Sequence, residues 1–326
     1  MKIFKHSLIL TLTLFLYTSC LSQIKIIDVE AIPFDIYPLV IDAKPNLPSP
    51  FKTNDSEEYV VAITKIKKYA VISVTLSNNR GICQQLIVDT SDFPELAETG
   101  LHSEKSLNEI KTITGRSLAE ITKLGRPNGL SYSGFLAEDE NIISVLIGDN
   151  QIVRKLGLTH PQLAKPLFHV LNMMDTDLAL NRWNMAKHQW ENICCFYYND
   201  NKVFVKAVDT KGGQQSIFDE GIEGAFHIKL WHEFDAEEIK YLNEHYGHLS
   251  SKEFDDFKIK LSFINTGEMQ PQYIMRYGFY EGHTFWRADP IAVSFIFGFK
   301  SLEELDLIFR GKLYEALIEH FTESNK

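Results

Sequence analysis

The residues best suited to acid–base chemistry in this chain are Glu281 and His283, which are separated by a single glycine. A carboxyl group and an imidazole can each exchange protons with a substrate when their surroundings tune their pKa values. Large rings crowd residues 272–289, and such rings would desolvate a carboxylate and raise its pKa. We therefore expect Glu281 and His283 to form a catalytic pair that exchanges protons; a salt-bridged structural turn is the alternative.

The same stretch supplies candidate substrate-binding residues. Arg276 and Arg287 carry guanidinium groups that suit an anionic substrate group, or that would simply neutralise a nearby carboxylate. Tyr280 and Trp286 add aromatic surface, and an apolar run follows at residues 291–297. Polar groups among large rings, beside a segment that must be buried, are typical of a pocket wall.

Two residues from elsewhere in the chain are assigned to the same predicted site. Arg126 lies in a loop rich in glycine and serine, GRPNGLSYSG, that lacks the lysine of a P-loop and the GxSxG of a nucleophile elbow. The loop is either a surface connection or a ligand-contacting loop, in which Arg126 would hold an anion. His160 precedes Pro161, so it either donates into a site or lies in the first turn of a helix.

A metal site is a weaker possibility. His245 and His248 are three residues apart near a predicted helix end, which is compatible with a zinc hydrolase. However, the chain contains neither HExxH nor CxxC, and both histidines also suit a solvent-facing helix end. We expect no metal and no cofactor.

The cysteines leave the disulfide state open. Cys83, Cys194 and Cys195 remain if Cys20 is removed or lipidated, and an odd number leaves at least one free thiol. One disulfide from Cys83 to either of the adjacent cysteines is allowed by the sequence.

Residues 1–22 are expected to be an export signal. Two lysines precede a short apolar segment at 8–16, which is too short for a permanent membrane anchor. Cleavage before Cys20 would give a lipoprotein, whereas cleavage before Gln23 would give an ordinary exported protein. Under both alternatives the chain is exported, and we expect it to be periplasmic, anchored to the outer membrane as a lipoprotein, or secreted.

Composition narrows the range of partners. The 326 residues carry a net charge of −10 without a basic stripe, so nucleic acid is a poor partner. We expect a membrane contact only through a lipid on Cys20, and a small molecule, glycan or peptide as ligand.

The order of predicted elements favours an α+β fold. After the signal, residues 23–100 read as β-rich with an antiparallel meander at their centre, and residues 101–326 as mixed α and β with a helical C-terminal part. The alternative is that the two parts form one continuous domain. A β-hairpin is expected at 193–208, a single helix at 138–156 and a last single helix after Ser301. Serine or aspartate followed three residues later by glutamate predicts helix starts at Ser106, Ser117, Asp235, Ser250 and Ser301. Asp289 and Pro290 predict a buried helix that ends at Gly298.

Together these patterns predict an exported envelope protein that acts as a metal-independent acid–base hydrolase with a Glu/His/Arg pocket. The alternative is a non-catalytic binding or assembly lipoprotein that uses the aromatic-rich surface to hold a partner.

Overall fold

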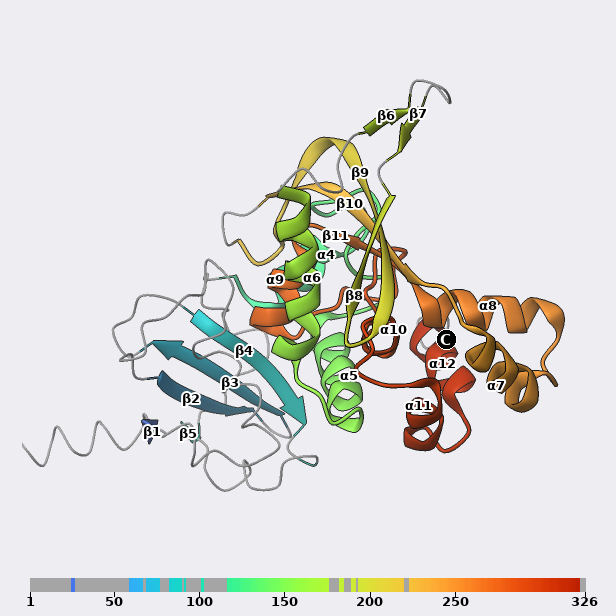
Figure 1. The fold of residues 1–326 in the computed structure, drawn as a ribbon. Helices are drawn as coiled ribbons and strands as arrows, with labels where there is room; N and C mark the ends of the chain where they lie inside the picture. Colours follow the sequence, from blue (N-terminus) through green and yellow to red (C-terminus); the bar gives the residue numbers. More distant parts are fainter. Residues whose placement is uncertain are drawn as a thin grey trace, which may run out of the picture. The chain divides into compact units, whose positions relative to one another are not determined.

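The structure is a computed structural model, and it describes the following residues: 25–26, 59–66, 69–76, 82–89, 91, 101–102, 116–175, 182–184, 189–191, 193–219 and 223–322. The predicted export signal at 1–22 and the Ser106 helix start lie outside these residues. The chain divides into two compact units, 1–106 and 107–326. Both helices and antiparallel sheets are present, so the fold is α+β (Figure 1).

The first unit contains the predicted meander. Strands β2 (Tyr59–Ile66), β3 (Tyr69–Leu76) and β4 (Ile82–Asp89) pair antiparallel in sequence order. Two short strands, β1 (Lys25–Ile26) and β5 (Leu101–His102), also pair with β2. Branched and apolar residues in these runs favour such pleated pairing.

The second unit is built on a four-stranded antiparallel sheet of order β11-β10-β9-β8. The predicted hairpin is confirmed: β8 (Ile193–Tyr198) turns into β9 (Asn201–Gln215) through Asn199 and Asp200, both at positive φ. Strand β10 (Glu223–His232) follows, and β11 (Phe263–Gly267) pairs with its outer edge. A small separate ribbon joins β6 (Arg182–Asn184) to β7 (Gln189–Glu191).

Helix α10 (Pro290–Ile296) lies at the centre of the second unit and is buried along its whole length. It contacts strands β10 and β11 and three helices: α5 (Ile142–Lys155), α6 (His160–Asp175) and α8 (Ser251–Ser262). As predicted, the Asp289 side chain accepts a hydrogen bond from the Ile291 amide, at 2.8 Å, and so caps this helix. Gly298 follows the helix at a φ of 65°.

The remaining helices complete two groups. Helices α4 (Leu118–Gly125) and α9 (Gln270–Tyr277) pack against α5 and α6 respectively. Helices α7 (Ala236–Tyr246), α11 (Leu302–Ile308) and α12 (Leu313–Thr322) share an apolar cluster with α8 and α10 (Figure 1). The four predicted capping boxes at Ser117, Asp235, Ser250 and Ser301 are all present.

Two predicted helices have different limits in the structure. The helix expected from residue 138 begins only at Ile142, after an Asn141 cap, because the Glu140 carboxylate is held by other groups. The single helix expected after Ser301 is two helices, α11 and α12, because Arg310 and Gly311 both adopt positive φ between them. Strand β11 and helix α9 were not predicted.

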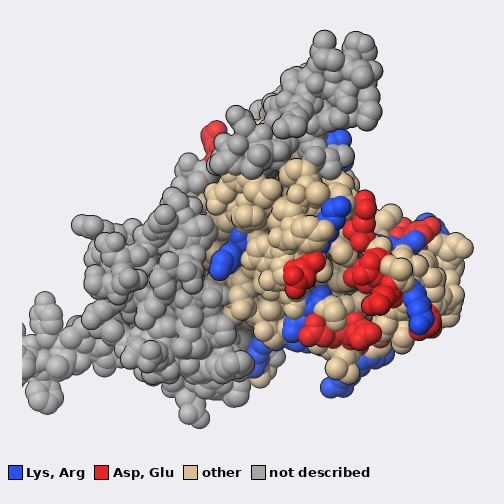
Figure 2. Space-filling model, viewed as in Figure 1, with Lys and Arg blue, Asp and Glu red and all other residues tan. Residues whose placement is uncertain are grey.

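Acidic side chains gather over the helical end of the second unit, around α7, α8 and α11 (Figure 2). Most carboxylates of α7 and α8 are exposed, as a solvated helix face would be. In the described ranges, no helix combines the length and apolar character that crossing a membrane requires.

Candidate functional site

The turn between α9 and α10 carries the predicted pair, and two close approaches fix its path. Gly278, at a φ of 65°, would place a Cβ 2.8 Å from Nε2 of the His160 ring. Gly282 would place a Cβ against the Glu140 carboxylate and 2.9 Å from the Leu136 Cα atom. Its amide donates to the Phe135 carbonyl at 2.7 Å. The turn is therefore wedged against residues 135–140, and only glycine fits at these two positions.

Glu281 and His283, on either side of Gly282, line different hollows. We call these the Glu281 hollow and the His283 hollow. Because the two side chains line different hollows, the structure does not support the direct proton exchange that was predicted between them.

The Glu281 hollow has a volume of about 250 Å³. It lies between the GRPNGLSYSG loop, one end of the sheet and the start of α9. Its walls combine carboxyl, amide and hydroxyl groups with large rings, from Ser131, Ser133, Gly134, Phe135, Gln214, Gly224, Phe226, His227, Gly267, Glu268, Met269, Gln270, Glu281 and Trp286.

Glu281 is the buried carboxyl group of this hollow, with 6% of its surface exposed. Its φ is 64°, a left-handed conformation that costs a non-glycine residue about 1–3 kcal/mol. Burial raises the pKa of Glu281 well above the ordinary value, while the Thr284 hydroxyl, 3.2 Å from Oε2, and the Arg287 charge oppose only part of the rise. Within the described residues its carboxyl group forms no ion pair. Glu281 is therefore a buried carboxyl group that lines the hollow, and its surroundings favour the protonated form.

Trp286 and His227 form one wall of the same hollow. Their ring centroids are 3.8 Å apart at an angle of 42°. Burial, followed by the Lys229 charge, lowers the pKa of His227. This wall is therefore aromatic and uncharged at neutral pH.

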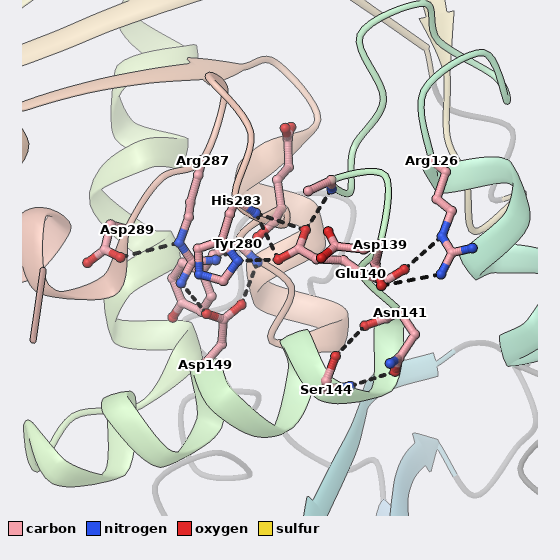
Figure 3. Close-up of polar contacts among 12 residues, drawn as sticks. Arg126, Asp139, Glu140, Asn141, Ser144, Asp149, Tyr280, His283, Arg287 and Asp289 are labelled. Atoms are coloured by element: carbon pink, nitrogen blue, oxygen red, sulfur yellow. Dashed lines mark hydrogen bonds and ion pairs between the residues drawn. The ribbon is translucent and has the colours of Figure 1, made fainter. Parts of the chain in front are cut away.

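The His283 hollow is larger, about 550 Å³, and lies on the other side of the turn. Glu140 and His283 form an ion pair there, and the Glu140 carboxylate also accepts the His283 amide at 3.0 Å and the Ala137 amide at 2.7 Å (Figure 3). Burial alone would raise the pKa of Glu140, but these hydrogen bonds outweigh burial and lower it. Glu140 is thus an ionised clamp on the His283 end of the turn.

Arg287 is a buried structural cation that contacts three partners. It pairs with Asp149 and, at 3.3 Å, with Asp289, and its Nη1 donates to the Glu281 main-chain oxygen at 2.6 Å (Figure 3). Burial would lower the pKa of Arg287, but the two carboxylates raise it, so it stays charged. Burial raises the pKa of Asp149 to about 6 against the opposing charge of Arg287. Arg287 also lines the His283 hollow, and with these partners it positions the turn, while its predicted role in holding a substrate anion stays a prediction.

Tyr280 and His160 lie in the core, with none of their surface exposed. The Tyr280 hydroxyl lies 3.1 Å from Nδ1 of His160, whose Nε2 lies 3.2 Å from the Asn150 side-chain oxygen. Burial lowers the pKa of His160 to about 3, so the ring is neutral. Both were predicted to contact substrate. Because both are fully buried, we assign them instead to the packing that supports the turn.

The remaining predicted site residues are Arg126, Arg276 and Trp286, and the structure places each of them differently. Arg126 donates from Nε to the Glu140 carbonyl at 2.8 Å, so it holds the backbone beside the site instead of gripping a ligand anion. Arg276 is partly buried in the last turn of α9 and does not line either hollow. Trp286 does line the Glu281 hollow.

Sequence reasoning did not identify Glu140, Asp149, Glu268 or Gln270. Glu140 stood in an acidic triplet that resembled a helix start, and Asp149 in the middle of a predicted helix. Glu268 and Gln270 immediately follow the unpredicted strand β11, and recognising that strand would have placed them at a sheet edge.

The metal and disulfide alternatives can also be compared with the described residues. No three of their His, Cys, Asp or Glu side chains come together as a metal site. His245 stacks on Tyr241 with ring centroids 3.9 Å apart, and its Nδ1 lies 3.0 Å from the Tyr241 carbonyl oxygen. Cys194 and Cys195 are free thiols.

Comparisons with known proteins found no relative of this chain. No protein-family model matches the chain, and neither the curated proteins nor the solved structures contain a match.

Proposed function

We propose that the protein is a metal-independent acid–base hydrolase whose proton donor is Glu281. The observation that supports this most strongly is a buried carboxyl group at a hollow, without an ion-pair partner among the described residues. A purely structural carboxylate in this position would be expected to pair with the nearest cation. Arg287 instead binds the main-chain oxygen of Glu281, and the carboxyl group accepts a hydrogen bond from the uncharged Thr284 hydroxyl.

A second carboxyl group completes the chemistry. Glu268 lines the same hollow and is partly exposed, whereas Glu281 is buried. Two carboxyl groups in unlike surroundings are the usual arrangement for an acid and a base in one site. Glu281 donates its proton to the leaving atom as the bond breaks, and Glu268 takes a proton from the attacking water.

The test measures hydrolysis by the full chain, which is purified in a buffer that contains EDTA to remove trace metals. Peptides, carboxylic esters, phosphate esters and glycans are offered in turn. One class should be hydrolysed, and Glu281→Gln should slow that reaction by about 10²–10⁴-fold. Glu237→Gln, an exposed change on α7, is the matched control. Hydrolysis of no class, or an undiminished rate in Glu281→Gln, contradicts the proposal.

A non-catalytic binding protein is the second candidate function, and one observation favours it. Tyr132 and Phe285 are 90% and 71% exposed, and each is a chain neighbour of residues that line the Glu281 hollow. Exposed rings beside a hollow are typical of a binding surface. Ligand binding without turnover, retained in Glu281→Gln, would select this candidate.

We further propose that the protein works in the cell envelope. The support is the sequence: two lysines, a short apolar segment and the Ser19–Cys20 pair. Cys20→Ser should release a lipid-anchored protein from the membrane fraction. Membrane association that does not change in Cys20→Ser argues against the lipid anchor.

A further inference from the structure

The Glu281 hollow has the chemistry of a site for an uncharged, hydroxyl-rich ligand. Its described lining residues include neither lysine nor arginine, so it lacks a permanent cation for a phosphate or carboxylate. What remains are hydroxyl and amide groups, two carboxyl groups and aromatic rings. A hydroxyl group of a ligand can donate to or accept from each of these polar side chains.

Gln270 adds a specific acceptor to this set. The residue has none of its surface exposed and lines the hollow, and its Nε2 donates to the Phe279 carbonyl at 3.0 Å. Its Oε1 is buried and has no hydrogen-bond partner among the described residues. A buried acceptor left without a donor is destabilising, so a ligand hydroxyl that reached it would be stabilised by this hydrogen bond.

Exposed aromatic rings adjoin the lining residues of the hollow at two places in the chain. Trp286 lines it, and the exposed Phe285 ring meets the Trp286 ring edge-on with centroids 5.0 Å apart. Tyr132 lies between the lining residues Ser131 and Ser133 and is almost fully exposed. Sugar rings present apolar C–H faces together with hydroxyl edges, so they suit a surface of rings interleaved with amides and hydroxyls.

We propose that the Glu281 hollow is the central subsite for an uncharged glycan, with Phe285 and Tyr132 holding sugar units on either side of it. This inference rests on the proposed hydrolase function and names its substrate class. In the reaction, Glu281 protonates the glycosidic oxygen as the bond from that oxygen to the anomeric carbon breaks. Water adds to the anomeric carbon and gives its proton to Glu268, so one water is consumed and two shorter sugars leave. Exchange with solvent then restores both carboxyl groups.

The experiment compares neutral and charged hexasaccharides with the full chain. The neutral probes are β-1,4-linked glucose, mannose, xylose and N-acetylglucosamine and α-1,4-linked glucose; the charged probes are oligogalacturonate and oligomannuronate. Binding is measured by calorimetry and cleavage by new reducing ends. At least one neutral probe should be bound and cleaved, and each charged probe should bind at least tenfold more weakly.

Two variants test the flanking rings. Phe285→Ala and Tyr132→Ala should each raise KM for the cleaved hexasaccharide more than for its disaccharide, by about 2- to 10-fold. Tyr197→Ala removes an exposed ring on β8 and should leave KM unchanged for both the hexasaccharide and the disaccharide. An unchanged KM ratio in both ring variants overturns the flanking subsites.

The outcomes separate the substrate class from the proposed function. Cleavage of peptides or esters, with glycans ignored, overturns the glycan inference and leaves the hydrolase standing. Binding of a neutral glycan without cleavage supports the glycan inference and overturns the hydrolase. Preference for the charged probes overturns the proposal of an uncharged glycan, because binding them requires a cation that the described lining of the hollow lacks.

Discussion

The Glu140 carboxylate accepts the main-chain amide of His283 at 3.0 Å and pairs with the His283 ring, although 143 residues separate the two. This relationship joins the segment before α5 to the turn before α10. It also gives His283 a structural partner, whereas Glu281 lines the other hollow. The two residues of the predicted pair therefore have different surroundings within one turn.

Removing the charge of the clamp should destabilise the fold. Glu140→Gln weakens the bonds to His283 and Ala137 while keeping the shape of the side chain. We expect a loss of about 1–3 kcal/mol in the free energy of unfolding, measured by urea denaturation at pH 7. Glu138→Gln, an exposed change two residues earlier, is the control and should have little effect. Equal stability of the two variants would contradict the clamp.

The same clamp predicts a dependence on pH. Because the folded pKa of Glu140 lies below the ordinary value of 4.5, its contribution is present above that value and is lost as pH falls through the folded pKa. The stability difference between wild type and Glu140→Gln should therefore shrink on acidification below 4.5. Unfolding curves at several pH values between neutrality and acid measure it. A difference that does not change with pH would argue against an ionised clamp.

Gly282 should not tolerate a side chain. Gly282→Ala places a methyl group against the Glu140 carboxylate and the Leu136 Cα atom, so we expect a loss of about 1–3 kcal/mol or more. Gly148→Ala is the matched change within α5, where nothing lies within 4 Å. It should stabilise the protein by about 0.5–1 kcal/mol because alanine favours a helix interior. Thermal unfolding of both variants checks this, and a Gly282→Ala protein as stable as wild type would refute the wedged turn.

Glu281 should show the opposite pH dependence to Glu140. A folded pKa above the ordinary 4.5 means that the folded chain holds a proton that the unfolded chain releases. The contribution of Glu281 to the free energy of unfolding is fully present below pH 4.5. Above pH 4.5 it falls by about 1.4 kcal/mol per pH unit until the pH reaches the folded pKa. Glu281→Gln cannot lose that proton, so its stability relative to wild type should increase between pH 5 and 7. A constant difference, measured by urea unfolding, would show that the carboxyl group is not held neutral.

Local signals in the sequence were sufficient for much of the fold. The capping boxes at Ser117, Asp235, Ser250 and Ser301, and the cap at Asp289, depend only on residues within one helical turn. The hairpin at 193–208 depends on two adjacent runs and a turn. These features were predicted correctly because their partners are close in sequence.

The site was harder to predict because its partners are distant. Glu281 was identified from its aromatic surroundings, but its expected partner His283 belongs to Glu140 from another part of the chain. Arg287 was read as a substrate anchor because Asp149, 138 residues away, could not be known as its partner. Burial of Tyr280 and His160 likewise depends on how α6 and the turn pack together.

If Glu281 gives a proton to the leaving group, the effect of Glu281→Gln must depend on whether the leaving group needs a proton. The rate of Glu281→Gln relative to wild type is measured on two substrates with the same glycan part. One has a sugar leaving group, which needs a proton, and the other has a dinitrophenolate leaving group, which departs without one. Glu281→Gln should lose about 10²–10⁴-fold in rate on the first substrate and far less on the second. An equal loss on both substrates, or no loss on the first, would contradict it.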